Sequence, residues 1–141
     1  MVESVKKASE KLFSAMGGPY DSETVNRFKA IGDENADKIW QTDPVLMVGN
    51  IGITDNQSDM WDMLDRIIEN RIATPNTILE SHYSVLSKDK VLDVTKFEYY
   101  VTLKDSTVGP PLIGVQTTLW ANINGEWKTQ YHHQSWERKP E

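Results

Sequence analysis

Apolar residues recur every three or four positions through the first forty residues, which is the spacing of one face of an α-helix. This pattern predicts an amphipathic helix over 3–16, ended by the Gly-Gly-Pro sequence at 17–19. It predicts a second helix over 21–31 and, after a break, a short helical segment over 34–40 that brings Trp40 to the core. We therefore expect the N-terminal part of the chain to be helical.

The middle of the chain changes from strand-like to helical patterning. Residues 45–48 are predicted to form a buried strand closed by Gly49 and Gly52. From Asp55 the apolar residues return to helical spacing on one arc, which consists of Met60, Trp61, Leu64, Ile67, Ile68 and Ile72. Charged residues occupy the opposite arc. We interpret them as a solvent-exposed face rather than a metal site, because no histidine joins them.

Long strand-like segments follow one another through the rest of the chain. They span 76–86, 91–103, 111–123 and 126–136, and are rich in threonine, tyrosine and β-branched residues. Turn-forming sequences separate them, so consecutive antiparallel pairing is the simplest arrangement. Helices first and strands afterwards indicate an α+β fold, in which helices cover one face of a curved sheet.

The last two strands are joined by Asn124-Gly125, which favours a two-residue β-turn. Antiparallel pairing across this turn sets Trp120 opposite Thr129, Thr118 opposite Tyr131 and Gln116 opposite His133. Because side chains alternate along a strand, one face of the hairpin carries Gln116, Thr118, Trp120, Trp127, Thr129, Tyr131 and His133. The opposite face carries Val115, Leu119, Ala121, Ile123, Lys128, Gln130, His132 and Trp136.

The first of these faces mixes aromatic rings with hydroxyl, amide and imidazole groups, as the walls of a partly apolar pocket do. There the His133 imidazole would accept a proton, and the Tyr131 phenol would donate to a developing oxyanion. The expected ligand contacts are Trp40, Thr118, Trp120 and Thr129. A purely structural interpretation stays open, because a buried histidine is commonly a hydrogen-bonded part of a core.

The same alternation limits other chemistry. Adjacent strand histidines point to opposite faces and cannot share one metal ion, so we expect neither a metal site nor a cofactor. Four polar residues lie in strands whose register the sequence leaves open, so their facing is not predicted: Glu80, His82, Asp93 and Glu98.

Composition narrows the possible partners. The 141 residues carry a formal net charge of -6 and no basic tract, which disfavours nucleic acid. No window approaches the roughly 18 apolar residues of a membrane span, and the acids near the N-terminus do not suit a signal peptide. The chain has no cysteine, which excludes disulfides and fits a reducing cytoplasm. We expect one cytoplasmic domain over 1–141 that binds neither nucleic acid nor membrane.

Several short sequences, taken in order, resemble the nuclear transport factor 2-like superfamily, particularly its SnoaL-like and ketosteroid isomerase-like branches. They are Gly32-Asp33, Trp40, Asp43-Pro44, Gly125-Glu126-Trp127 and His133-Gln134-Ser135, and the resemblance covers roughly residues 22–136. It implies a cone-like, cystatin-like α+β fold, in which helices close over a strongly curved, mainly antiparallel sheet and leave a pocket. It also implies a homodimer packed through the sheets. Residues 1–20 would then be an N-terminal helical extension.

Function does not follow from this fold, because the superfamily includes isomerases, cyclases, hydrolases, dehydratases and proteins that only bind or assemble. Ketosteroid isomerase chemistry is disfavoured, since its carboxylate base would fall near Met47 or Val48. SnoaL-like cyclases use an aspartate and a histidine, and His133 with Tyr131 would supply comparable acid-base groups.

Two hypotheses remain. The leading one is a pocket protein that binds an unknown small molecule, with acid-base activity of the cyclase, isomerase or hydratase kind. The alternative is a non-catalytic binding or assembly module that forms a homodimer through its sheet. Its apolar surface would comprise Val115, Leu119, Ala121, Ile123 and Trp136.

Overall fold

The computed structural model describes residues 1–31, 47–49, 52–54, 62, 65–66 and 68–140. Three sequence predictions therefore concern residues outside the described part of the chain. These are the short helical segment over 34–40 with Trp40, the start of the strand expected at 45–48, and most of the apolar helix expected after Asp55.

Two helices open the chain, as the periodicity predicts. Helix α1 (Val2–Gly17) ends before Gly18, which has a φ of 81° that favours glycine, and Pro19 follows. Helix α2 (Ser22–Ile31) is capped by Asp21, whose Oδ1 accepts a hydrogen bond of 2.8 Å from the Thr24 backbone N–H. Among the described residues, no helix combines the length and the apolar character needed to cross a membrane.

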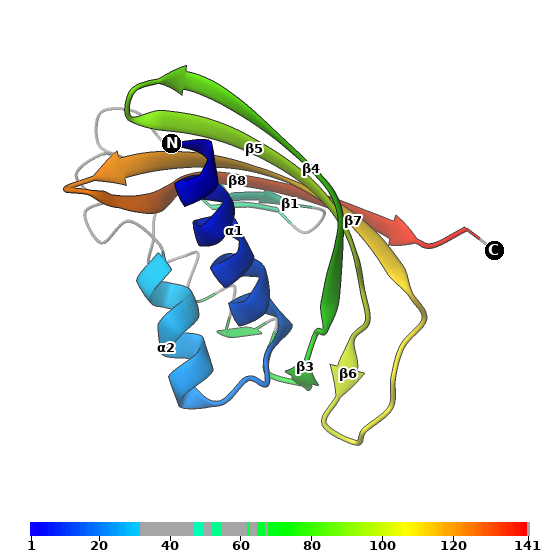
Figure 1. The fold of residues 1–141 in the computed structure, drawn as a ribbon. Helices are drawn as coiled ribbons and strands as arrows, with labels where there is room; N and C mark the ends of the chain where they lie inside the picture. The colour runs from blue at the N-terminus through cyan, green and yellow to red at the C-terminus, as the bar shows by residue number, and fades with distance from the viewer. Residues whose placement is uncertain (32–46, 50–51, 55–61, 63–64, 67, 141) are drawn as a thin grey trace.

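A six-stranded sheet follows, and four consecutive strands of it, from β8 to β4, are the predicted antiparallel meander (Figure 1). Its strands are β1 (Met47–Gly49), β2 (Gly52–Thr54), β4 (Asn76–Ser87), β5 (Lys90–Tyr99), β7 (Leu112–Ile123) and β8 (Glu126–Arg138), in the spatial order β2-β1-β8-β7-β5-β4. Strand β1 pairs parallel to β8, and the other neighbours pair antiparallel. Two very short strands, β3 (Arg71–Ala73) and β6 (Thr102–Leu103), form a separate two-stranded sheet. Ile72 therefore lies in a strand and not in the predicted helix, and the strand predicted over 91–103 is divided into β5 and β6.

Helix α1 covers one face of the curved sheet (Figure 1), which we call the covered face. Val5 and Leu12 of the helix pack on Val91 and Trp120 of the sheet, and all four are buried. Further along the helix, Phe13 lies edge-on against the Phe97 ring at a centroid distance of 4.9 Å. These aromatic and aliphatic contacts remove much apolar surface from water. The segment expected as an N-terminal extension therefore supplies part of the core.

The final hairpin contains an irregularity that the sequence did not reveal. Its turn is as predicted, because Asn124 and Gly125 both have positive φ angles, 53° and 87°. The predicted pair Trp120 and Thr129 is confirmed, but the next pair along is Leu119 with Tyr131. Gln130 is thus an extra residue, a β-bulge in β8.

The bulge makes the other two predicted pairs wrong. Thr118 lies opposite His132 rather than Tyr131, and Gln116 lies opposite Gln134 rather than His133. Because side chains alternate along a strand, one extra residue moves every following side chain to the other face. The predicted faces of β8 are therefore reversed beyond Gln130, and Trp136, which lies opposite Gly114, joins the covered face.

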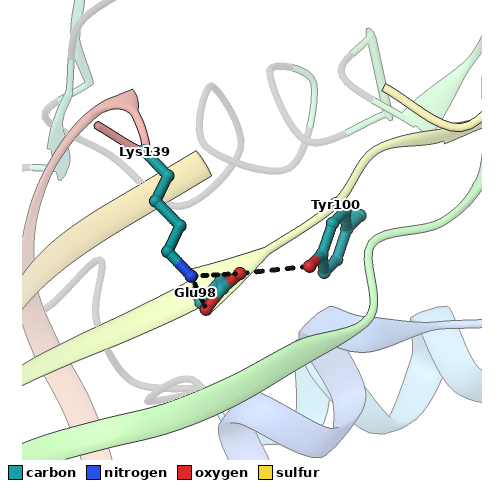
Figure 2. A network of polar contacts seen from close by, with 3 residues as sticks. All are labelled: Glu98, Tyr100 and Lys139. Carbon is teal, nitrogen blue, oxygen red and sulfur yellow. Dashed lines mark hydrogen bonds and ion pairs between the residues drawn. The ribbon is translucent and has the colours of Figure 1, made fainter. Parts of the chain in front are cut away.

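The C-terminal end of β8 is tied to the end of β5 (Figure 2). The Lys139 ammonium contacts both carboxylate oxygens of Glu98, at 3.2 and 3.3 Å, and the Tyr100 hydroxyl donates to one of them at 3.1 Å. The Lys139 backbone N–H also donates to the Pro111 carbonyl at 3.0 Å. Exposed ion pairs of this kind contribute little stability, so they position the chain end more than they strengthen the fold.

Gly114 gives the first testable expectation, because the buried Phe97 ring lies directly over it. A Cβ atom added at Gly114 would come within 2.6 Å of the ring, a distance that no real contact tolerates. Gly114→Ala should therefore lower the free energy of unfolding by about 1–3 kcal/mol, measured by urea denaturation. Gly109→Ala is the matched control, because its added Cβ meets the Val101 carbonyl oxygen at an ordinary 3.6 Å. Equal stability of the two variants would contradict this packing.

Candidate functional site

Two rows of polar side chains cross the covered face from β4 to β8. The strand registers place them side by side: Tyr83, Asp93, Thr118 and His132 form one row, and Ser81, Thr95, Gln116 and Gln134 form the next. We call these eight residues the polar belt. Apolar groups border it on both sides, with Val91 and Trp120 at one margin and Phe97 at the other. The belt is therefore a strip of hydrogen-bonding groups within an otherwise apolar interface.

The β5 part of the belt is closed by its own hydrogen bonds. The Asp93 carboxyl group, 1% exposed, accepts a bond of 2.6 Å from the Thr95 hydroxyl and one of 3.2 Å from the Trp120 indole N–H. The Thr95 hydroxyl also lies 3.1 Å from that of Ser81. A buried carboxyl group is tolerated only with such partners. The hydrogen bonds around Asp93 thus link β4, β5 and β7.

Tyr83 lies at the β4 end of the same row. Partial burial, together with the nearby Asp93 carboxyl, raises the pKa of its phenol, which therefore stays protonated at neutral pH. The Ser9 hydroxyl of α1 lies close to this phenol and is 1% exposed, yet it has no hydrogen bond of normal geometry among the described residues. The helix therefore places one polar group next to the belt.

His132 occupies the β8 end. Its Nδ1 lies 3.2 Å from the Thr118 hydroxyl, which also accepts a bond of 3.2 Å from the Gln116 amide. Burial of the imidazole lowers the pKa of His132 to about 4, so the ring is neutral at pH 7. Thr118 and Gln116 are almost fully buried, whereas His132 and Gln134 keep part of their surface exposed. The β8 end is thus the less enclosed end of the belt.

The structure separates the sequence-predicted site residues. Thr118, Trp120 and Thr129 lie on the covered face, although all three are buried and Trp120 belongs to the apolar core. Tyr131 and His133 pair with Leu119 and Thr117 on the opposite face, which we call the open face. Their predicted place in the pocket wall is therefore wrong, because the bulge at Gln130 turns both side chains to the other face. Trp40 lies outside the described residues.

The residues whose register the sequence left open are also divided. Asp93 belongs to the covered face. Glu80, His82 and Glu98 alternate with the covered residues and therefore lie on the open face. There Glu80 bonds His82, with 2.6 Å between the carboxylate oxygen and Nε2. The candidate residues that sequence reasoning missed are His132 and Gln134. Alternation alone would have found them only if the bulge had been known.

This arrangement limits what the site can do. Asp93 and His132 are two strands apart, about 10 Å between their Cα atoms at the usual strand spacing. Thr118 lies between them, so they do not form a directly bonded acid-base pair. A neutral imidazole whose pKa is about 4 is a good hydrogen-bonding group but a weak general base at pH 7. The geometry therefore suits recognition of a neutral ligand better than strong base catalysis.

Comparison with known proteins shows the fold. No protein-family model matches the chain, and no curated protein matches it in sequence. Among solved structures, it is similar to a proposed dehydratase from the NTF2-like family of Streptomyces avermitilis, with a TM-score of 0.79 and 18% identity over 95% of this chain and 94% of that one. It is also similar to a ketosteroid isomerase-like protein from Erwinia carotovora atroseptica, with a TM-score of 0.72 and 15% identity over 97% and 96% of the two chains.

A third similar structure is a hexachlorocyclohexane dehydrochlorinase from Novosphingobium barchaimii, with a TM-score of 0.71 and 14% identity over 99% of this chain and 92% of that one. The chain therefore has the cystatin-like α+β fold that NTF2-like and ketosteroid isomerase-like proteins share, as the sequence predicts. Because the identities are low, these similarities establish the architecture and not an activity.

The lowered pKa of His132 predicts how stability depends on pH. In the unfolded chain this histidine takes up a proton near pH 6.5, but in the folded chain only near pH 4. Stability from this group is therefore complete above pH 6.5 and is lost as the pH falls towards 4, by about 2–3 kcal/mol. His132→Gln should remove that part of the loss, whereas His133→Gln should retain it. Urea denaturation of both variants at pH 7 and pH 4.5 tests this, and an identical loss in both would contradict it.

Proposed function

We propose that the covered face holds a small-molecule site at the β8 end of the polar belt, with His132 as its central contact. The observation that carries this proposal is the belt itself. Burying Asp93, Thr95, Gln116 and Thr118 in one strip of the sheet costs stability that an apolar interface would not lose. The two members on β8, His132 and Gln134, remain partly exposed. Binding a ligand there is the use that explains the arrangement.

The chemistry of these two residues favours an uncharged ligand with hydroxyl or carbonyl groups. The His132 imidazole is neutral at pH 7, and the Gln134 amide carries no charge. One offers a ring nitrogen and the other both a donor and an acceptor, while the bordering Trp120 and Phe97 make the surroundings apolar. A partly apolar site with a few convergent polar groups is the usual form of a small-molecule pocket.

Proton transfer is a second possible activity of the same site, and the acid-base role first assigned to His133 and Tyr131 passes here to His132. Its support is the fold, which is shared with a dehydrochlorinase and with a proposed dehydratase. A ligand group that bears negative charge next to the ring would raise the pKa of His132 and strengthen it as a base. Without such a group, the site binds but does not abstract protons efficiently.

Homodimerisation through the open face belongs to the proposal as well. Leu92, Val94, Val115 and Leu119 lie on that face beside Tyr131, and Val115 is 38% exposed. Two members of the originally expected surface are unsuitable, because Ala121 is buried and Trp136 lies on the covered side. A cytoplasmic location, supported by the absence of cysteine, completes the proposal.

The adjacent histidines provide a matched pair for testing the site. A thermal-shift screen of uncharged hydroxyl- and carbonyl-bearing compounds should yield binders of the wild-type protein. His132→Gln should weaken binding of such a compound about tenfold, the effect of one lost hydrogen bond to the ligand. His133→Gln, one residue away on the open face, should bind as the wild type does. Equal affinity of all three proteins would exclude His132 as a contact, and the absence of any binder would count against the site.

A further inference from the structure

Strand β4 is the last strand of the sheet, and no strand of the described residues pairs with its outer edge. The sheet order ends at β4, whose only neighbour is β5, and Figure 1 shows it, in green, along the rim of the sheet. Nine of its 12 residues are exposed, including some on the covered side. A long edge strand presents a row of unpaired backbone N–H and C=O groups, which is a template for another strand.

The exposed side chains of β4 are unusually apolar for an edge. Ile78, Leu79, Val85 and Leu86 are 37%, 49%, 53% and 58% exposed. Edge strands are commonly protected from pairing by lysine or proline, but residues 76–87 contain neither. Register irregularities interrupt the strand at Ile78/Glu80 and at Val85/Ser87 and leave a regular run between them. This edge therefore lacks most of the features that prevent an exposed edge strand from pairing with another strand.

The apolar residues are arranged symmetrically about His82. The sequence from 78 to 86, ILESHYSVL, has two aliphatic residues at each end and four polar or aromatic residues around the central histidine. An antiparallel copy centred on His82 pairs Ile78 with Leu86, Leu79 with Val85, Glu80 with Ser84 and Ser81 with Tyr83. In this alignment every aliphatic residue stands opposite another in sequence, with Leu79 and Leu86 at the two irregularities that flank the regular run. The strand is thus self-complementary in an orientation that a two-fold axis requires.

The charged groups agree with the same pairing. Within one chain, the Glu80 carboxylate bonds His82 at 2.6 Å on the open face. In the paired arrangement the second copy's Glu80 lies diagonally across from His82, within reach of a side chain of that length. The two Glu80 carboxylates, by contrast, are each opposite Ser84 and do not face one another. The pairing that brings the aliphatic residues together therefore also places Glu80 carboxylates near the two central imidazoles.

We propose that β4 pairs with β4 of a second copy of this chain, antiparallel and centred on His82, to continue the six-stranded sheet across a two-fold axis. This surface is separate from the open face and from the polar belt, so the inference does not depend on the proposed function. Edge pairing of one strand buries less than the roughly 1,200 Å² typical of stable complexes. The association is consequently weak, with a dissociation constant on the order of 10–100 µM.

The absence of cysteine in the chain allows a clean cross-linking test. His82→Cys should give a covalent dimer on oxidation with copper phenanthroline, because the two introduced thiols face each other at the axis. Glu80→Cys and Ser84→Cys should each cross-link poorly alone, but a mixture of the two should form a mixed dimer. Val115→Cys, on the open face, is the control for association through the other surface. Cross-linking of Val115→Cys but not of His82→Cys would overturn the proposal.

Sedimentation provides a second, independent test that needs no cysteine. Leu79→Lys places a charge on the edge of β4, and the residue is exposed, so the fold should be retained. This variant should weaken dimerisation at least about tenfold relative to the wild type. Leu103→Lys, at another exposed leucine outside β4, should leave it unchanged. A wild-type protein that remains monomeric at about 500 µM, well above the expected dissociation constant, would overturn the proposal.

Discussion

One extra residue in β8 decides which side chains the interior of this protein contains. Gln130 has no partner on β7, and every residue after it therefore points to the opposite face from the one that simple alternation gives. His132 enters the polar belt because of this bulge, and His133 leaves it. Without the bulge, Tyr131 and His133 would lie beneath α1, and the interior would hold a different pair of ionisable groups. The chemistry of the covered face thus depends on a backbone irregularity.

The polar belt differs between its β5 part, which is closed by internal hydrogen bonds, and its β8 end, which is partly exposed. Near β5, the Asp93 carboxyl group is fully used by the Thr95 hydroxyl and the Trp120 indole, and this cluster joins three strands under the helix. At β8, the Thr118 hydroxyl bonds His132 while part of the histidine stays exposed. Apolar packing of Phe13 and Leu12 on either side holds the helix over the belt. The closed end supports the fold, and the less enclosed end is where we propose that a ligand binds.

Much of the architecture could be predicted from sequence because its signals are long and regular. The apolar spacing of α1 spans sixteen residues, and each strand of the meander contains ten or more. The positive φ angles of Asn124 and Gly125 follow from residue types that favour them, so the turn and the pairing of Trp120 with Thr129 were predictable. Strands β2 and β3, with only three residues each, are too short to give a periodic signal.

The site was less predictable for a specific physical reason. The sequence Thr129-Gln130-Tyr131 contains no glycine or other residue that would mark a bulge, and its effect on two adjacent histidines is to exchange their faces. The facing of Asp93 was left open by the sequence, since it depends on registers set by tertiary packing. A strand pattern shows that a sheet carries polar side chains, but the face that each one occupies depends on bulges and on register.

The protonation of the two imidazoles tests this account most directly. A pH titration of the ring ¹⁵N resonances, assigned with His132→Gln and His133→Gln, would follow each histidine separately. The account predicts that the His132 ring stays neutral until the pH approaches 4, because it lies in the belt beside Thr118. If His132 instead titrated near pH 6.5 like a solvated histidine, it would not be buried in the belt. The bulge, and the site built on it, would then be wrong.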